Sequence, residues 1–207
     1  MYLPKHFAET DVSTMHALMR GHPLATLICH GAAGLEANHI PFLLVDQPAP
    51  YGTLQGHIAR ANPLSKAGEG IDDVLVVFQG AESYISPSNY ATKAEHGKVV
   101  PTWNYTAVHA YGRLRLIDDP EWIFAQISAL TVINESPLPK PWAVSDAPAD
   151  YIEKMLGAIV GVEITIERLI GKWKVSQNQP PANQASLIAA LKETGNPMAE
   201  LIQAQQQ

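Results

Sequence analysis

One short segment of the chain, residues 99–112, is unusually rich in side chains that can form hydrogen bonds or stack on a flat ligand. It contains Thr102, Trp103, Asn104, Tyr105, Thr106, His109 and Tyr111. Buried hydrogen-bonding groups cost free energy unless they find partners, so a purely structural strand has little use for so many of them. This density favours a binding site for a planar ligand with a polar rim.

The alternation of side chains along a strand divides this segment into two faces. Thr102, Asn104 and Thr106 share a face with Val108, Ala110, Leu114 and Leu116, as expected for the interior of a sheet. The opposite face begins with Trp103 and Tyr105, continues through His109 and Tyr111, and ends at Arg113 and Arg115. Aromatic residues followed by charge are typical of a cleft or a subunit interface. Ordinary packing between aromatic residues of neighbouring strands is the alternative.

A second candidate segment, residues 56–66, gathers cations and hydrogen-bond donors where a strand is predicted to end. Arg60, Asn62 and Lys66 could hold a terminal phosphate, because arginine binds oxyanions through two parallel hydrogen bonds. His57 lies in the same segment. The alternative is a polar turn initiated by the Asn62-Pro63 pair.

Two further segments carry candidate ligand contacts. His39 precedes a proline within a predicted strand, which suggests an edge or a bulge that re-aims side chains. We place His39 on the same face as Ala37 and Leu43, toward a core or cleft, where a hydrogen-bonded structural histidine is equally plausible. Lys174 and Gln177 could reach a phosphate or a ring carbonyl, or could belong to a solvated strand end.

The composition excludes several classes of protein. The chain has 207 residues, a formal net charge of −6 and one cysteine, Cys29. A single cysteine rules out an intrachain disulfide and a cysteine cluster for zinc or iron–sulfur, and the acidic balance argues weakly against a nucleic-acid-binding surface. No apolar run is long enough to span a bilayer, and the start of the chain has no signal region, so we expect a cytosolic protein. Motifs of phosphate-binding loops, serine hydrolases and zinc peptidases are absent, which leaves flavoproteins among the enzyme classes.

The pattern of turns and apolar residues predicts about seven short strands and several helices. Strands are expected over 24–29, 35–45, 53–58, 73–79, 83–86, 102–117 and 159–169, with 171–176 as an extension. A turn over residues 31–34 is expected to join the first two strands into a hairpin. Helices are expected from Thr10 or Asp11 to Gly21, from Asp118 or Asp119 to about Asn134, and over 148–156, 183–194 and 198 onward, with one turn at 63–66 and a loop or short helix over 87–97. Without regular alternation of strands and helices, this order predicts a mainly β fold, an antiparallel sheet or barrel with peripheral helices.

Taken together, these segments resemble the PaiB family of FMN-binding split-barrel proteins. The motifs that carry the likeness occur in the family's order and reach to about Asn178. They are residues 1–7, 38–41, 56–63, 78–80, 84–90, 97–105, 108–112 and 171–174.

The resemblance implies a dimeric split β-barrel, related to that of pyridoxamine phosphate oxidases, over residues 1–180, followed by a helical tail over 181–207. It also implies FMN at the dimer interface and a role as a negative transcriptional regulator. On this basis we expect the FMN contacts to be His39, His57, Arg60, Asn62, Lys66, Thr102, Trp103, Asn104, Tyr105, Lys174 and Gln177.

Two functions remain open at this point. The first is an FMN-binding regulator with DNA as a candidate partner, although no helix-turn-helix with a basic second helix is present. The second is an FMN-dependent oxidoreductase or flavin reductase that uses NAD(P)H, with Trp103 and His39 or His57 shaping the substrate side. A third, haem binding through His57 or His109, rests on fold analogy alone.

Overall fold

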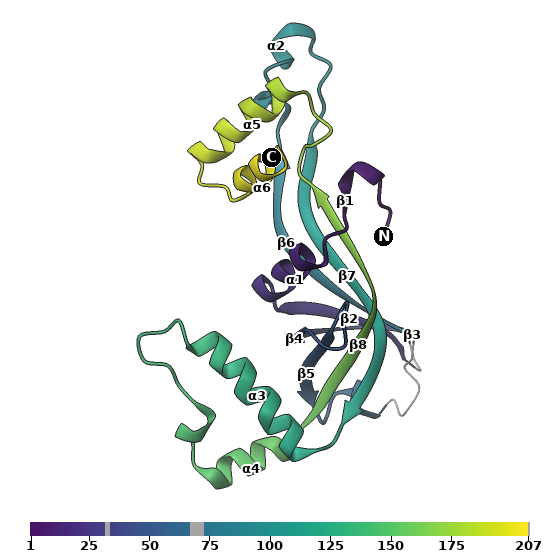
Figure 1. The fold of residues 1–207 in the computed structure, drawn as a ribbon, viewed down its shortest axis with the longest axis vertical. Helices are drawn as coiled ribbons and strands as arrows, with labels where there is room; N and C mark the ends of the chain where they lie inside the picture. The colour runs from purple at the N-terminus through teal and green to yellow at the C-terminus, as the bar shows by residue number, and fades with distance from the viewer. Residues whose placement is uncertain (32–33, 67–72, 207) are drawn as a thin grey trace. The chain divides into compact units, whose positions relative to one another are not determined.

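The computed structural model describes residues 1–31, 34–66 and 73–206. A single sheet dominates the fold, and its strands follow the order β3-β2-β6-β7-β8-β5-β4 (Figure 1). The strands are β1 (Ala8–Glu9), β2 (Leu24–Gly31), β3 (Gly34–Pro41), β4 (Leu43–Val45), β5 (Thr53–Ala59), β6 (Val74–Ile85), β7 (Thr102–Ile117) and β8 (Ile159–Lys174). The two-residue strand β1 pairs with β8 off this path. The expected antiparallel, mainly β fold with peripheral helices is confirmed.

The α-helices of the described chain lie close to their predicted positions. They are α1 (Val12–Gly21), α2 (Lys93–His96), α3 (Pro120–Glu135), α4 (Ala149–Gly157), α5 (Pro181–Glu193) and α6 (Met198–Ala204). Short 3₁₀ turns occupy Lys5–Phe7, Pro63–Lys66, Pro87–Asn89 and Val144–Asp146. The Asp11 carboxylate accepts hydrogen bonds from the start of α1, and Asp119 does the same for α3. Both are N-caps of the kind that the sequence predicts.

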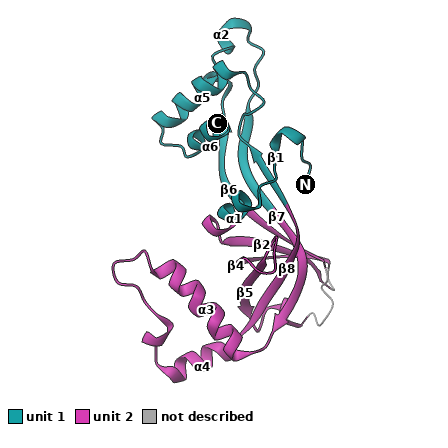
Figure 2. Cartoon of the chain, viewed as in Figure 1, with its two compact units in different colours: residues 1–18, 79–108, 170–207 teal, residues 19–78, 109–169 magenta. Residues whose placement is uncertain are grey.

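Two compact units share the sheet (Figure 2). Unit 1 comprises residues 1–18, 79–108 and 170–207, and unit 2 comprises 19–78 and 109–169. Each has its own buried apolar residues. Unit 1 buries Ile85, Val108, Val175, Leu187, Met198 and Ile202, and unit 2 buries Leu27, Leu54, Val76, Phe78, Val162 and Ile164. The predicted division into 1–180 and 181–207 stays a prediction.

The sheet curls back on itself within unit 2. Strand β3, at one end of the strand order, contacts β5 near the other end. Gly56 in β5 makes this approach possible, because a Cβ there would lie 2.9 Å from Ile40 Cγ2 and 3.2 Å from Phe42 Cδ1. Gly56 therefore gives neighbouring side chains room against β5.

Two strand predictions are corrected by the structure. The strand expected over 35–45 is two strands, because the chain leaves the ladder after Pro41 and the Phe42 N–H donates to Pro23 O at 2.9 Å. The strands expected over 73–79 and 83–86 are one strand, β6. It continues through Gly80, whose missing Cβ leaves room for Thr106 Oγ1 and Leu18.

Part of one predicted hairpin turn lies outside the described residues. Gly31 pairs with Gly34, as the predicted β2–β3 hairpin requires, but Ala32 and Ala33 between them are not described. No helix of the described chain is both long and apolar enough to span a membrane. Within the same ranges, no group of three or more His, Cys, Asp and Glu side chains is arranged to hold a metal ion.

Candidate functional site

The strongest candidate site lies in unit 1, where the start of β7 meets the end of β8. The Lys174 ammonium donates to Thr102 Oγ1 at 2.5 Å and also to the Trp103 carbonyl oxygen. Burial lowers the pKa of Lys174, and the charge of Lys172 lowers that pKa further. Lys174, Thr102 and Trp103, which the sequence analysis selects, are thus in contact, and the Lys174 ammonium is partly desolvated.

Aromatic rings contact the neighbouring residues Trp103 and Lys172. Trp103 and Tyr84 form an edge-to-face pair with ring centres 5.8 Å apart, and they remain 55% and 52% exposed. Lys172 is only 7% exposed, and its Nζ lies 5.2 Å from the centre of the Tyr105 ring and 5.8 Å from that of Tyr2. We call Tyr2, Tyr84, Trp103, Tyr105, Lys172 and Lys174 the aromatic–lysine cluster. It combines exposed ring surface with two ammonium groups.

The sequence points to most of this cluster but not to all of it. Tyr84 and Tyr2 were not selected as ligand contacts, although both lie in motifs that the family shares. Lys172 is likewise absent from the predicted FMN contacts. The alternation Lys172-Trp173-Lys174 is the signal that could have identified it, since it puts both lysines on one face of β8. Trp173, between them, is buried.

Asn104 and Gln177 have structural roles in unit 1. Asn104 is 1% exposed, and its Nδ2 donates to Ser176 Oγ at 2.8 Å. Its Oδ1 is buried without a hydrogen-bond partner among the residues described. Gln177 Oε1 accepts from the Val175 N–H at 2.8 Å, and its Nε2 donates to Trp173 O at 2.6 Å. These bonds close a turn around Ser176, whose φ of 63° is in the left-handed region.

In unit 2, Arg60 is held by several partners. Its Nη1 and Nη2 donate to the two carboxylate oxygens of Asp118 at 2.9 and 2.6 Å. Its Nε donates to Gly157 O and its Nη2 to Ile159 O. The hydrogen bond from Arg60 lowers the pKa of Asp118. The oxyanion that Arg60 binds in this structure is therefore a carboxylate of the chain itself.

The other candidates of unit 2 each have a different environment within the chain. His57 Nδ1 lies 2.9 Å from Oε1 of the buried Gln126 on α3. Asn62 donates to Asn38 Oδ1 at 2.8 Å and accepts from the Leu64 N–H at 3.0 Å. Lys66 is exposed at the end of its 3₁₀ turn.

The predicted orientation of His39 is wrong. His39 and Ala37 are exposed, and the buried side of this part of the chain carries Ile40 and Phe42. The alternation continues across Pro41, since Ile40, Phe42 and Leu44 are all buried, so the prediction assigned the wrong face to the core. His39 Nδ1 lies 3.1 Å from Thr26 Oγ1 on the paired strand β2.

Comparison with known proteins identifies relatives along almost the whole chain. Residues 1–168 match the model of a family described as "Putative FMN-binding domain". The chain is 30% identical to "Protease synthase and sporulation protein PAI 2" of Bacillus subtilis, across 98% of this chain and 97% of that protein. It is 35% identical to an uncharacterized protein, AN0679, of Emericella nidulans, across 98% of this chain and 94% of that one.

Solved structures share the fold at low sequence identity. An FAD and heme binding protein from Mycobacterium smegmatis superposes with a TM-score of 0.61 at 16% identity, covering 88% of this chain and 79% of that one. The conserved hypothetical protein Rv2991 from Mycobacterium tuberculosis gives 0.60 at 11% identity, covering 87% and 94%. At such identities the likeness concerns the fold alone. The family match and the relative from Bacillus subtilis together establish that the chain belongs to the PaiB family, whose shared domain is described as FMN-binding.

Proposed function

We propose that this protein binds FMN and that the aromatic–lysine cluster of unit 1 is the centre of its binding site. The contact among Lys174, Thr102 and Trp103 carries the proposal. A flavin is a large aromatic ring system, and exposed indole and phenol rings offer it surfaces on which to stack. Its terminal phosphate is anionic and pairs well with an ammonium that has already lost part of its water.

The lowered pKa of Lys174 has a consequence for this proposal. Burial and Lys172 both disfavour the charged form, so a bound phosphate would favour it by supplying the missing negative charge. Lys174 then binds the phosphate, and Thr102 and the Trp103 carbonyl orient the ammonium. The ring chemistry belongs to the flavin when it is bound, and these residues bind and orient it.

A flavin titration of matched variants tests this assignment. Lys174→Gln should weaken FMN binding by about tenfold or more, the effect of a hydrogen bond to a charged group. Its effect on riboflavin, which lacks the phosphate, should be small. Arg113→Gln is the control, because Arg113 pairs at the surface with Glu167 in unit 2. Equal losses for FMN and riboflavin would show that Lys174 does not bind the phosphate.

The phosphate contacts predicted around Arg60, Asn62 and Lys66 remain an alternative position. Arg60 can bind a phosphate only by giving up some of its bonds to Asp118, Gly157 and Ile159. Arg60→Gln therefore distinguishes the two positions. If Arg60→Gln weakens the binding of FMN but not of riboflavin, and Lys174→Gln weakens the binding of neither ligand, the phosphate lies at Arg60.

We also propose that the protein is a homodimer with FMN at the subunit interface. The exposed Trp103–Tyr84 pair supports this, because aromatic side chains are enriched in interfaces. Light scattering should give the mass of a dimer, and Trp103→Ser should weaken both association and FMN binding. A monomeric wild type that binds FMN would contradict the dimer while leaving the flavin site intact.

For the cellular role we propose a negative transcriptional regulator of the PaiB type. Membership of the family and the sporulation-related name of the relative from Bacillus subtilis support this role. A mobility-shift assay at low salt tests direct DNA contact, since phosphate contacts weaken as salt rises. Rapid bleaching of bound flavin by NAD(P)H, with no DNA shift, would favour the oxidoreductase instead.

A further inference from the structure

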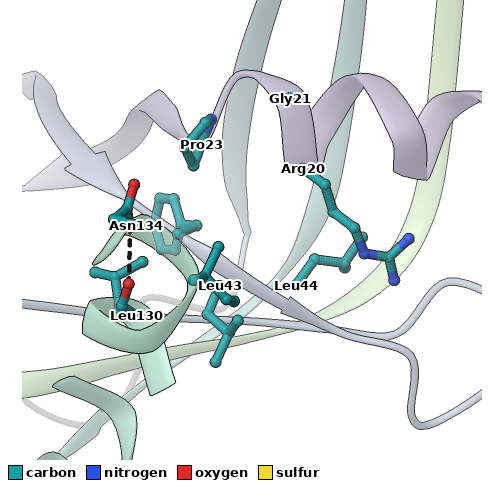
Figure 3. A pocket seen from close by; sticks show the side chains of 9 residues that line it. Arg20, Gly21, Pro23, Leu43, Leu44, Leu130 and Asn134 are labelled. Atoms are coloured by element: carbon teal, nitrogen blue, oxygen red, sulfur yellow. Dashed lines mark hydrogen bonds between the residues drawn. The ribbon is translucent and has the colours of Figure 1, made fainter. Parts of the chain in front are cut away.

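Unit 2 contains a cavity of about 410 Å³ that none of the residues proposed to contact FMN lines. Its apolar wall includes Pro23, Phe42, Leu44, Leu130 and Ile133, drawn in Figure 3 with Leu43. The wall is built from the segment after α1, from the region of β4 and from the last turns of α3. Small-molecule sites in proteins are commonly concave, mostly apolar and of this size.

The cavity has one cationic group, Arg20, at the end of α1. In Figure 3 its guanidinium lies on the opposite side of the labelled group from Leu130 and Asn134, with Leu43 and Leu44 between them. The Asn134 amide donates to Leu130 O at 2.8 Å, so it is used within α3. The cavity therefore presents an aliphatic surface with its charge at one end.

Arg20 can hold more than its present partner. Its Nη2 donates to the Asp46 carboxylate, and both side chains are about half exposed or more. A guanidinium carries five N–H donors in a fixed planar fork, so a second carboxylate can bind beside Asp46 or replace it.

Helix α3, which forms one wall of the cavity, carries several apolar side chains that are exposed to solvent. Only Ile123 and Gln126 are buried along α3, whereas Phe124, Val132 and Ile133 are exposed. At the cavity, Ile133 is 55% exposed and lines the wall together with the buried Phe42 and Leu44.

We propose that this cavity binds an aliphatic monocarboxylate, with the chain against the apolar wall and the carboxylate on Arg20. The charge of Arg20 selects an anionic head group over a neutral or cationic one. Bidentate guanidinium–carboxylate pairing fixes the head group at one end, and the apolar wall takes the chain. The residues involved are separate from those assigned to FMN, so this site and the flavin site can fail independently.

Calorimetric titration of the full chain with three ten-carbon ligands tests the proposal. Decanoate, decanol and decylamine share the chain and differ in the head group. We expect decanoate to bind at one per chain, decanol about tenfold more weakly, and decylamine more weakly still. Equal binding of decanoate and decylamine, or no binding of decanoate, would overturn the proposal.

Variants of exposed residues separate a built site from adsorption to apolar surface. Arg20→Gln should weaken decanoate binding about tenfold and leave decanol unchanged. Ile133→Asp should weaken both ligands, because it places a charge in the apolar wall. Arg113→Gln, which alters a more exposed arginine paired with Glu167, should change neither. Decanoate binding that is insensitive to Arg20→Gln and Ile133→Asp would also overturn the proposal, whatever the result for FMN.

Discussion

The C-terminal helices should be an integral part of unit 1 and not an appendage, and Leu187→Ala tests this directly. Leu187 on α5 has no exposed surface, and α5 contacts α6, whose Met198 and Ile202 are also fully buried. Replacing a fully buried leucine with alanine costs the transfer free energy of the lost methyl groups plus the cost of the cavity. We expect a loss of about 3 kcal/mol.

Urea unfolding followed by circular dichroism measures this loss. With a slope of about 1–3 kcal/mol per molar urea, the midpoint should fall by about 1–3 M. Leu35→Ala removes the same atoms from a residue that is 79% exposed, so it should change stability by less than about 0.5 kcal/mol. Hydrogen exchange then locates the effect, because a shared core predicts faster exchange across residues 79–108 as well as in α5 and α6. Faster exchange confined to 181–207 would refute the reasoning and favour a separate tail.

Three other predictions concern glycines, a helix cap and pH. Gly112→Ala should destabilise the protein by about 3 kcal/mol, because a Cβ there would lie 2.1 Å from Thr165 O. A Cβ at Gly157, at the end of α4, would meet nothing within 4 Å, so Gly157→Ala should stabilise the protein by up to about 1 kcal/mol. Chemical denaturation compares the two variants. Asp119→Ala removes the acceptor of the Glu121 and Trp122 N–H groups at the start of α3, so it should lower the free energy of unfolding by about 1 kcal/mol in the same assay. An unchanged midpoint would mean that the cap contributes nothing to stability. Burial lowers the pKa of His109 below its usual 6.5, so its neutral form stabilises the fold above about pH 6.5 and this contribution is lost as the pH falls through the lowered pKa. The stability difference between wild type and His109→Gln should therefore narrow below pH 6.5, and a difference independent of pH would contradict this.

Local sequence signals were enough to predict most of the fold. β7 occupies the predicted residues 102–117, and the buried face of its first half carries Asn104, Thr106 and Val108 as the alternation requires. The helix caps were equally predictable, because an aspartate before a helix accepts hydrogen bonds from N–H groups that have no partner within the helix. The errors came at Pro41 and Gly80, where contacts with distant residues decide whether a strand ends or continues.

The candidate site was less predictable, because residue type does not reveal which partner a side chain finds. Arg60 looks like a phosphate ligand from its neighbours in sequence, yet Asp118, 58 positions away, takes both ends of its guanidinium. Gln177 bonds to the backbone within four residues of itself, a local use that its sequence context left open. Lys174 and Thr102 were both selected, but their direct contact depends on how β7 and β8 are aligned.

Neither compact unit is a continuous stretch of chain. The boundary falls within α1 and within the three longest strands, β6, β7 and β8, at residues 18/19, 78/79, 108/109 and 169/170. Unit 1 is therefore encoded by three separate pieces of the gene and unit 2 by two. No single truncation can yield either one intact, and recombination cannot exchange one of them as a module.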